Sequence, residues 1–385
     1  MFRFLLPLWF LASVGLFLYS FTQVSLGLTL TRASFAQSIQ QGFQYIGYFN
    51  RPLSTVLFIA LVLLLFSLFV ATLKAVRRGA VTKKILIAII GTVVACVLLS
   101  YSAFSFDIFN YIFDAKIVTQ YQDNPYAKRA LDYPADPMLS FMHWTHRTYP
   151  YGPVWLGVSI PVSYLGMQYF LPTYFLFKIL AGIAYIGTIF YIYKTLQKIS
   201  PKNALVGAAF FGLNPLILIE FLVSGHNDSV MVFFAAWGIF LLVTRKYIFS
   251  ILLVLLSIGT KYATAFLLPM IGLFAVPKRV SYEHSALIGV VAGIGAVFAA
   301  AMSSGNFQPW YLVYVLFPAA FLAHKYFITI PVILISLFAC LYYVPYLYTG
   351  NWDAPIPKYL QYWMTSGAVF GIVCAGIYKL VKKQS

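Results

Sequence analysis

The sequence predicts an all-α, polytopic membrane protein. Hydrophobic residues make up 62% of its 385 residues and charged residues only 9%, which is far from the composition of soluble globular domains. Crossing about 30 Å of hydrocarbon takes about 20 apolar residues per helix, so the chain has room for about 12 transmembrane helices and one substantial loop. A separate soluble domain is excluded.

The apolar runs divide the chain into three parts. Residues 1–84 hold the runs 4–28 and 53–73, which we predict to be two N-terminal transmembrane helices. The first is interpreted as a retained helix because no small-residue cleavage site ends it. Residues 85–325 hold the runs 85–104, 173–193, 203–222, 229–244 and 285–302, and the shorter or interrupted stretches 247–276 and 310–323. Residues 326–385 hold the runs 327–348 and 360–380.

Basic residues set the expected orientation. They cluster at 74–84, 194–202, 245–246, 278–279, 325 and 379–383. Loops rich in lysine and arginine stay cytoplasmic, which places both termini inside and every acid except Glu283 outside or at the outer membrane edge. The net charge of +17 therefore reports topology, and nucleic acid is not an expected partner.

One apolar segment conflicts with this orientation if it spans. Were 153–171 to cross the membrane, every later basic cluster would face outward. We therefore predict a helix that lies on the outer leaflet or re-enters it, interrupted by prolines. The outer loop then covers residues 105–172, and loops of that length are usually functional.

Five of the nine acids, Asp107, Asp114, Asp123, Asp132 and Asp136, lie in this loop. Ionisable groups held near lipid are a functional-site hypothesis by default. Asp107 follows the uncharged run 85–104 and shares a helical face with Asn110 or Tyr111 and with Asp114. Two interpretations of Asp107 stay open: an acid that starts a helix, which suits the helix dipole, or a general base at the membrane surface.

Other polar residues gather in three outer positions. In the same loop, His143 and His146 lack a third ligand at a spacing typical of metal sites, so we predict no metal there. Glu220, His226, Asn227 and Asp228 flank a turn; Asp228 or Asn227 could simply cap the next helix, which leaves His226 and Glu220 unexplained. Lys261 stands at the apex of the stretch 247–276, where it could snorkel or bind an anion such as phosphate.

Taken together, these motifs resemble a known family. The chain resembles polytopic glycosyltransferases of the C-type fold, closest to bacterial mannosyltransferases that use polyprenyl-phosphate mannose. The resemblance covers roughly residues 85–325. It is carried by an aspartate just after a span, followed in order by Asn124-Pro125-Tyr126, Tyr151-Gly152-Pro153, Asn214-Pro215 to Glu220, Gly225-His226-Asn227-Asp228, Thr260-Lys261-Tyr262 and Gln308-Pro309-Trp310-Tyr311.

The resemblance implies a site and its partners. It implies Asp107 as catalytic base and a surface-lying helix after Tyr151-Gly152-Pro153. Related enzymes that use pyrophosphate donors carry a metal-binding acid pair at the loop start, whereas Asp107-Ile108-Phe109-Asn110 has no second acid. We therefore expect a polyprenyl-phosphate sugar donor, a glycan or glycolipid acceptor, a membrane-lipid environment, and no metal or cofactor. The expected substrate-binding residues are Lys261, Tyr262, His226, Asn227, Asp228, Glu220, Asn110, Arg147, Tyr151, Gln308 and Trp310.

The expected reaction is inverting transfer of a hexose, mannose by resemblance, on the outer side of the cytoplasmic membrane. The alternative is a transporter or flippase of a lipid or small solute. Transporters bind at the bilayer midplane between repeated halves. This chain places its polar residues at the outer face and shows no paired halves, which favours the enzyme.

Overall fold

The computed structural model describes residues 4–276 and 279–384; Lys278, predicted to lie in a basic loop, is outside these residues. Within the described part the regular elements are helices, apart from one isolated β-bridge between Arg129 and Thr148. Six helices are long and apolar enough to cross a membrane, or seven if one bent pair counts as a single span. The prediction of an all-α polytopic protein is confirmed, whereas about 12 spans and the three-part division remain predictions.

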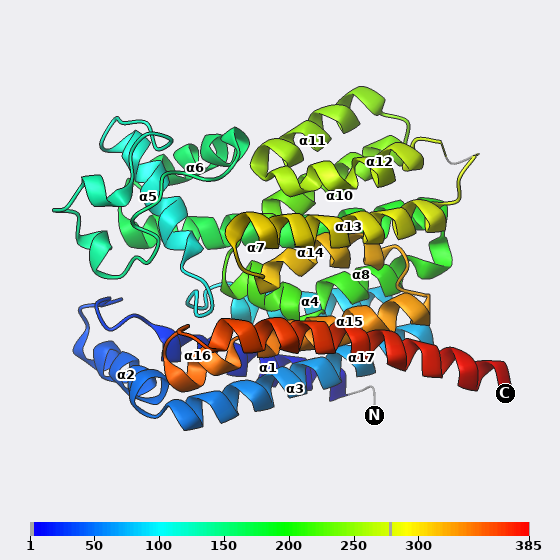
Figure 1. Ribbon diagram of the computed structural model, residues 1–385, viewed down its shortest axis with the longest axis horizontal. Coiled ribbons are helices and arrows are strands. Elements are labelled where there is room, and N and C mark those ends of the chain that lie inside the picture. Colours follow the sequence, from blue (N-terminus) through cyan, green and yellow to red (C-terminus); the bar gives the residue numbers. More distant parts are fainter. Residues whose placement is uncertain (1–3, 277–278, 385) are drawn as a thin grey trace.

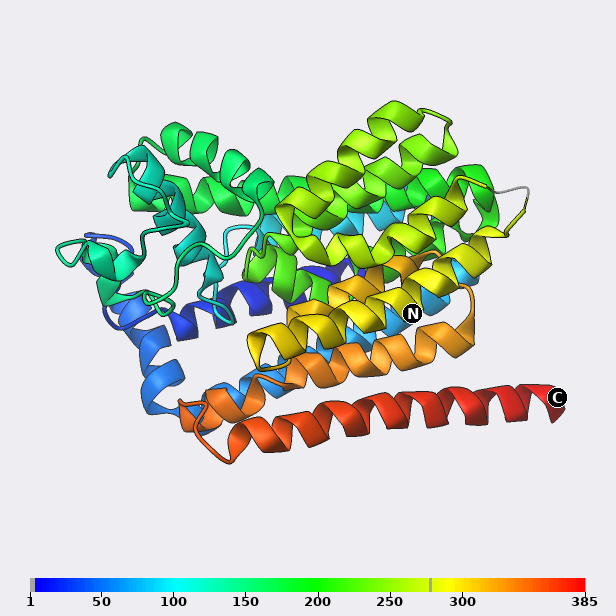
Figure 2. The same cartoon turned by 45° about the horizontal axis from the view of Figure 1, so that its top comes forward.

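The long helices lie side by side and form one bundle (Figure 1). They are α1 (Leu5–Ser20, continued to Gln23), α3 (Arg51–Arg77), α7 (Phe170–Ile199), α13 (Tyr282–Ser304), α15 (Tyr326–Leu341) with α16 (Val344–Thr349), and α17 (Ile356–Gln384). Figure 2 shows α17 along one edge of the bundle, next to α15.

The loops that carry basic clusters lie at one end of the bundle. These loops join α3 to α4 (Lys83–Val97), α7 to α8 (Ala204–Gly212), α10 (Asp228–Val243) to α11 (Tyr247–Thr260), and α14 (Val313–Ala320) to α15. The outer-loop helices α5 (Asp107–Thr119) and α6 (Pro153–Leu165) lie at the opposite end (Figure 1). This arrangement agrees with the alternation that the charges predict.

The segment 153–171 forms a short helix and not a span. Helix α6 has 13 residues, which gives a length of about 20 Å at 1.5 Å per residue. The chain then turns at Met167 and Gln168, both with positive φ, and enters α7. The helix is shorter than a typical span, as the sequence predicts; that it lies on or re-enters the outer leaflet remains a prediction.

The run 203–222 was predicted as one helix, and the structure shows two pieces bent by 50°. Pro215 has no N–H to continue α8, and the Asn214 side chain accepts a hydrogen bond from the Leu216 N–H at 3.0 Å. Helix α9 (Pro215–Ile217) follows, and then the π-helix η7 (Leu218–Val223). Hydropathy averaged over a window does not reveal this break. The break places Glu220 in a π-helix.

The stretch 247–276 consists of α11, the 3₁₀-helix η8 (Tyr262–Leu267) and α12 (Leu268–Phe274), with Lys261 at the junction as expected.

Helix α2 (Ser34–Gln44) is not predicted from the sequence, because it has no apolar run and shows only a few exposed apolar side chains such as Phe35 and Ile39.

Candidate active site

Asp107 is the first residue of α5, and its buried carboxylate meets three polar side chains. The Tyr151 hydroxyl donates a hydrogen bond to Oδ2 at 3.4 Å. Arg147 Nη2 lies 3.6 Å from Oδ1, and His226 Nδ1 lies 3.6 Å from Oδ2. The backbone N–H of Asp107 donates to Ser105 Oγ at 3.2 Å. Asp107 therefore starts a helix and also forms the centre of a polar cluster, so both interpretations of this residue describe part of its environment.

His226 lies between the Asp107 carboxylate and a second carboxylate, Glu220. Its Nε2 is 3.2 Å from Glu220 Oε2, and Tyr343 donates to Glu220 Oε1 at 2.9 Å. Neither imidazole nitrogen makes an aligned hydrogen bond to a described residue. The ring stacks on Trp310, with centroids 4.3 Å apart. The imidazole of His226 therefore lies between two carboxylates, those of Asp107 and Glu220.

The turn between η7 and α10 positions His226. Gly225 has φ +72°, and a Cβ there would come 3.1 Å from Ile108 Cδ1, so glycine suits this backbone. The fully buried Lys178 of α7 donates to the carbonyl oxygens of Leu222 and Val223 at the end of η7, and to Ser100 Oγ at 3.4 Å. Lys178 is not among the predicted site residues, although a lone lysine inside an apolar run is itself a signal.

Asp228 and Lys261 form an ion pair beside this cluster. Asp228 is fully buried, and Lys261 Nζ lies 2.8 Å from its Oδ2. The ammonium also lies 5.9 Å from the ring centroids of Tyr311 and Tyr314. Lys261 is therefore paired with a buried carboxylate. Neither predicted role of this lysine, snorkelling or binding an anion, includes that ion pair. Asp228 Oδ1 has no hydrogen-bond partner among the described residues.

Aromatic and amide groups connect the two clusters. The Tyr111 ring packs edge-on against Tyr151, with centroids 5.2 Å apart, and its hydroxyl accepts from the Asn227 N–H at 3.4 Å. Asn110 Nδ2 donates to the Trp144 carbonyl oxygen at 3.1 Å. Buried side-chain oxygens of Asn110 and Asn227 have no hydrogen-bond partner in the described part of the chain.

Most of the predicted residues come together, although the sequence separates them widely. Asp107, Arg147, Tyr151, Glu220, His226 and Trp310 form one cluster, and Asn110, Asn227, Asp228 and Lys261 lie next to it. Gln308 is half-buried at the rim of the neighbouring cavity. Tyr262 is 62% exposed, so the structure does not bring it into the cluster. Among the described residues, no three His, Cys, Asp or Glu side chains are grouped to hold a metal ion.

Asp114, two helical turns after Asp107, is a buried carboxyl in the outer loop. Burial raises its pKa from 3.8 to about 8; the positive charge of Arg147 opposes the rise and the negative charge of Asp107 adds to it. At neutral pH this carboxyl is largely protonated and can donate a hydrogen bond. The sequence placed Asp114 on the Asp107 face without predicting its burial.

We expect Asp114→Asn to stabilise the protein increasingly as pH rises. The pKa of Asp114 is higher in the folded than in the unfolded chain, so its contribution to stability is full below about pH 4 and is lost by about pH 8. Asparagine removes this dependence. The difference in Tm between the variant and wild type in detergent should grow from pH 5 to 8 and then level off.

Asp132→Asn is the matched control for this prediction. Asp132 is exposed, and the Arg129 N–H lowers its pKa, so its replacement should show no such growth with pH. A constant Tm difference for Asp114→Asn across this range would contradict the assigned burial.

Comparison with known proteins identifies the family. Residues 10–277 match the family model described as alpha-(1->6)-mannopyranosyltransferase, N-terminal domain. The chain belongs to this family. The match contains the Asp107, Glu220–Asp228 and Lys261 positions and ends before Gln308 and Trp310. The predicted resemblance to bacterial mannosyltransferases is thereby confirmed.

One curated relative is the alpha-(1->6)-mannopyranosyltransferase A of Corynebacterium glutamicum. It is 27% identical over 169 residues, which are 43% of this chain and 34% of the relative. The matched stretch thus spans about a third of the length of that protein. No solved structure matches the chain.

Proposed function

We propose that this protein transfers a mannosyl residue from a polyprenyl-phosphate donor to a hydroxyl of a glycan or glycolipid acceptor. The observation that carries the proposal is a buried aspartate at the start of the outer loop, in contact with Arg147, Tyr151 and His226, in a chain of the mannosyltransferase family. The family description and the relative's name give an α-(1→6) linkage, so the attacking group is a primary 6-hydroxyl.

Asp107 acts as the general base. The acceptor oxygen forms a bond to C1 of mannose while the bond between C1 and the phosphate oxygen breaks. The hydroxyl proton passes to Asp107, and polyprenyl phosphate leaves with the bonding electrons. A glycosidase protonates its poor alkoxide leaving group with a second carboxyl. A phosphate anion leaves without a proton, so one base is sufficient.

Neighbouring charged groups assist this step. His226 Nδ1 lies 3.6 Å from Asp107 Oδ2, and His226 Nε2 lies 3.2 Å from Glu220 Oε2. The proton can therefore pass from Asp107 through His226 to Glu220. Arg147 and Lys261 are the cations available to the phosphate. Lys261 retains hydrogen-bond donors after pairing with Asp228, because an ammonium has three.

The stereochemistry follows from a single displacement. Attack from the face opposite the leaving phosphate inverts the configuration at C1. An α-linked product then requires a β-linked mannosyl phosphate donor.

The proposed location is the outer side of the cytoplasmic membrane, in a C-type fold with about 12 spans. The basic loops gather at one end of the bundle and the Asp107 loop at the other (Figure 1). Because basic loops stay in the cytoplasm, the site faces outward, where soluble sugar nucleotides are absent and a lipid-linked donor is required.

The purified protein in detergent should transfer mannose from polyprenyl-phosphate mannose to an α-mannoside and should give no product from GDP-mannose. Transfer should persist in EDTA, because no second acid follows Asp107 in the pattern of pyrophosphate-using relatives. Product formation is followed by mass spectrometry. Activity that is lost in EDTA and restored by Mn²⁺ or Mg²⁺, or that requires the sugar nucleotide, would overturn the assigned donor class.

A further inference from the structure

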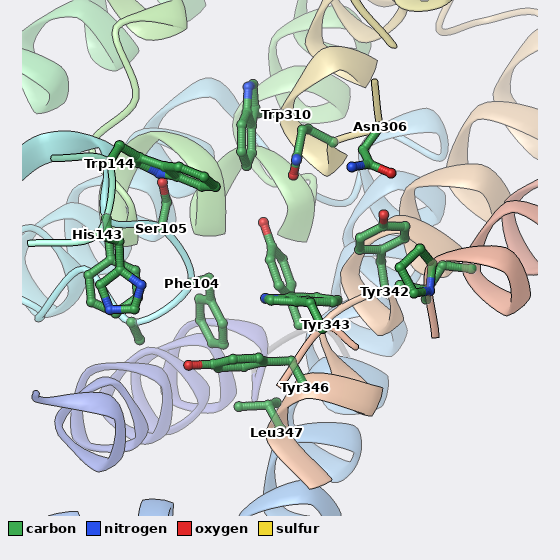
Figure 3. A pocket seen from close by; sticks show the side chains of 16 residues that line it. Phe104, Ser105, His143, Trp144, Asn306, Trp310, Tyr342, Tyr343, Tyr346 and Leu347 are labelled. Carbon is green, nitrogen blue, oxygen red and sulfur yellow. The ribbon is translucent and has the colours of Figure 1, made fainter. Parts of the chain in front are cut away.

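A cavity of about 280 Å³ lies beside the Asp107 cluster. The outer loop, the segment leading into α14 and the segment from α16 to the start of α17 form its walls. Figure 3 shows Trp144 and Trp310 pointing into one space, with Phe104 and Tyr343 across from them. The aromatic walls include Trp144, Trp310, Trp352, Tyr342, Tyr343 and Tyr346.

The walls of this cavity contact the side chains around Asp107. Trp310 stacks on His226, and the Tyr343 hydroxyl donates to Glu220. Ser105, which lines the cavity, accepts a hydrogen bond from the Asp107 N–H. The guanidinium of Arg147 lies 5.1 Å from the Trp144 ring centroid. A molecule in the cavity would therefore lie next to the proposed base.

Among its described lining residues, the cavity has no side chain that carries a permanent charge. His143 is the one titratable imidazole among them, and burial lowers the pKa of this group from 6.5, which favours the neutral form. Asn306, Gln308, Ser105 and tyrosine hydroxyls line it, and the described lining residues include no lysine, arginine, aspartate or glutamate. Asn306 is exposed and Gln308 is half-buried, and both line the cavity, so their side-chain amides are accessible to a ligand. A phosphate needs a cation, and the cations lie elsewhere, at Arg147 and Lys261.

We propose that this cavity binds the terminal sugar ring of the acceptor. The proposal rests on the proposed function and names the acceptor as a neutral saccharide. A pyranose presents one apolar face to an aromatic ring and hydroxyls to amides around its edge, which matches this wall. The volume is close to the lower end of small-molecule sites, roughly 300–1,000 Å³, and suits one or two sugar rings.

A polyprenyl chain is the competing occupant. Asn306 is exposed and Gln308 is half-buried, so water can bond both amides in the empty cavity. A hydrocarbon chain would displace that water without replacing its hydrogen bonds, which is unfavourable. Most of the lining residues also follow residue 277, beyond the stretch that matches the family's N-terminal domain. Acceptor recognition would thus be contributed by the C-terminal part of this chain.

Two variants test the proposal, one by removing an aromatic ring and the other by removing an amide. Trp352→Ala removes an aromatic face from an exposed position, and Gln308→Leu removes the amide while keeping similar bulk. The probe is α-(1→6)-mannobiose, whose binding to the purified protein is measured by saturation-transfer NMR without donor. Each variant should weaken binding about tenfold and raise the acceptor KM by a similar factor, with the donor KM unchanged. Trp237→Phe on α10, where Trp237 stacks on Tyr191, is the control and should match wild type.

The outcomes separate this proposal from the proposed function. Unchanged mannobiose affinity and acceptor KM in both variants, in a protein that still transfers mannose, would overturn the cavity assignment alone. A raised donor KM in Trp352→Ala, with Gln308→Leu neutral or favourable, would assign the cavity to the polyprenyl chain. Cavity-dependent binding of mannobiose without any transfer would overturn the proposed function and leave the saccharide site standing.

Discussion

Asp107→Asn is expected to lower the rate of mannosyl transfer about 10²–10⁴-fold, which is the usual cost of losing a general base. Asparagine is nearly isosteric and cannot accept the hydroxyl proton. The hydrogen bond to Ser105 uses the backbone N–H of residue 107 and is retained, so folding should survive. The turnover number and donor KM of the purified variant test this expectation.

Asp123→Asn provides the matched control in the same loop. The Asp123 carboxylate accepts a hydrogen bond from the Tyr133 hydroxyl at 2.7 Å, in an exposed contact. Its replacement should leave turnover close to wild type. Near-normal turnover by a stable Asp107→Asn protein would reduce Asp107 to a residue that starts a helix.

Lys261→Met should impair both stability and donor use. It leaves the fully buried Asp228 without its cation, and breaking a buried ion pair in this way costs about 3–5 kcal/mol. The side chain of Lys261 is 19% exposed, so a value near the lower end is expected. Thermal unfolding in detergent gives the loss of stability, and the donor KM gives the effect on phosphate binding.

The double variant Lys261→Met with Asp228→Asn separates these two effects. It removes the unpaired charge and should recover most of the lost stability. If Lys261 also binds the donor phosphate, the donor KM stays high in the double variant. Full recovery of the donor KM would limit Lys261 to its pairing with Asp228, and a stable single variant would contradict the importance of the pair.

The long apolar helices could be predicted from the sequence, because crossing a membrane requires a long apolar run. The basic loops also gather at one end of the bundle, as predicted (Figure 1), and which side of the membrane that end faces remains a prediction. The bend at Pro215 could not be predicted, since hydropathy averaged over a window does not register one missing N–H followed by a π-helix. Helix α2 was missed for a related reason. It is polar in sequence and has no apolar run.

The site residues were predicted as separate groups, and their contacts were not. Asp107 and His226 are far apart in the sequence, and only the packing of α5 against the η7–α10 turn brings them within 3.6 Å. The pairing of Lys261 with Asp228 depends on the same three-dimensional arrangement. Lys178 illustrates the converse case, because its signal was present in the sequence and its partners, backbone carbonyls, could not be identified there.

The proposed reaction is a single displacement at C1 in which Asp107 takes the proton. The anomeric configuration of the product tests it most directly. The wild-type protein is supplied with β-linked polyprenyl-phosphate mannose and an α-mannoside acceptor, and the new linkage is read from the one-bond C1–H1 coupling constant by NMR. We expect an α-(1→6) linkage, with polyprenyl phosphate released in equal amount. A β-linked product would require a second displacement through a covalent intermediate and would contradict Asp107 as a simple base.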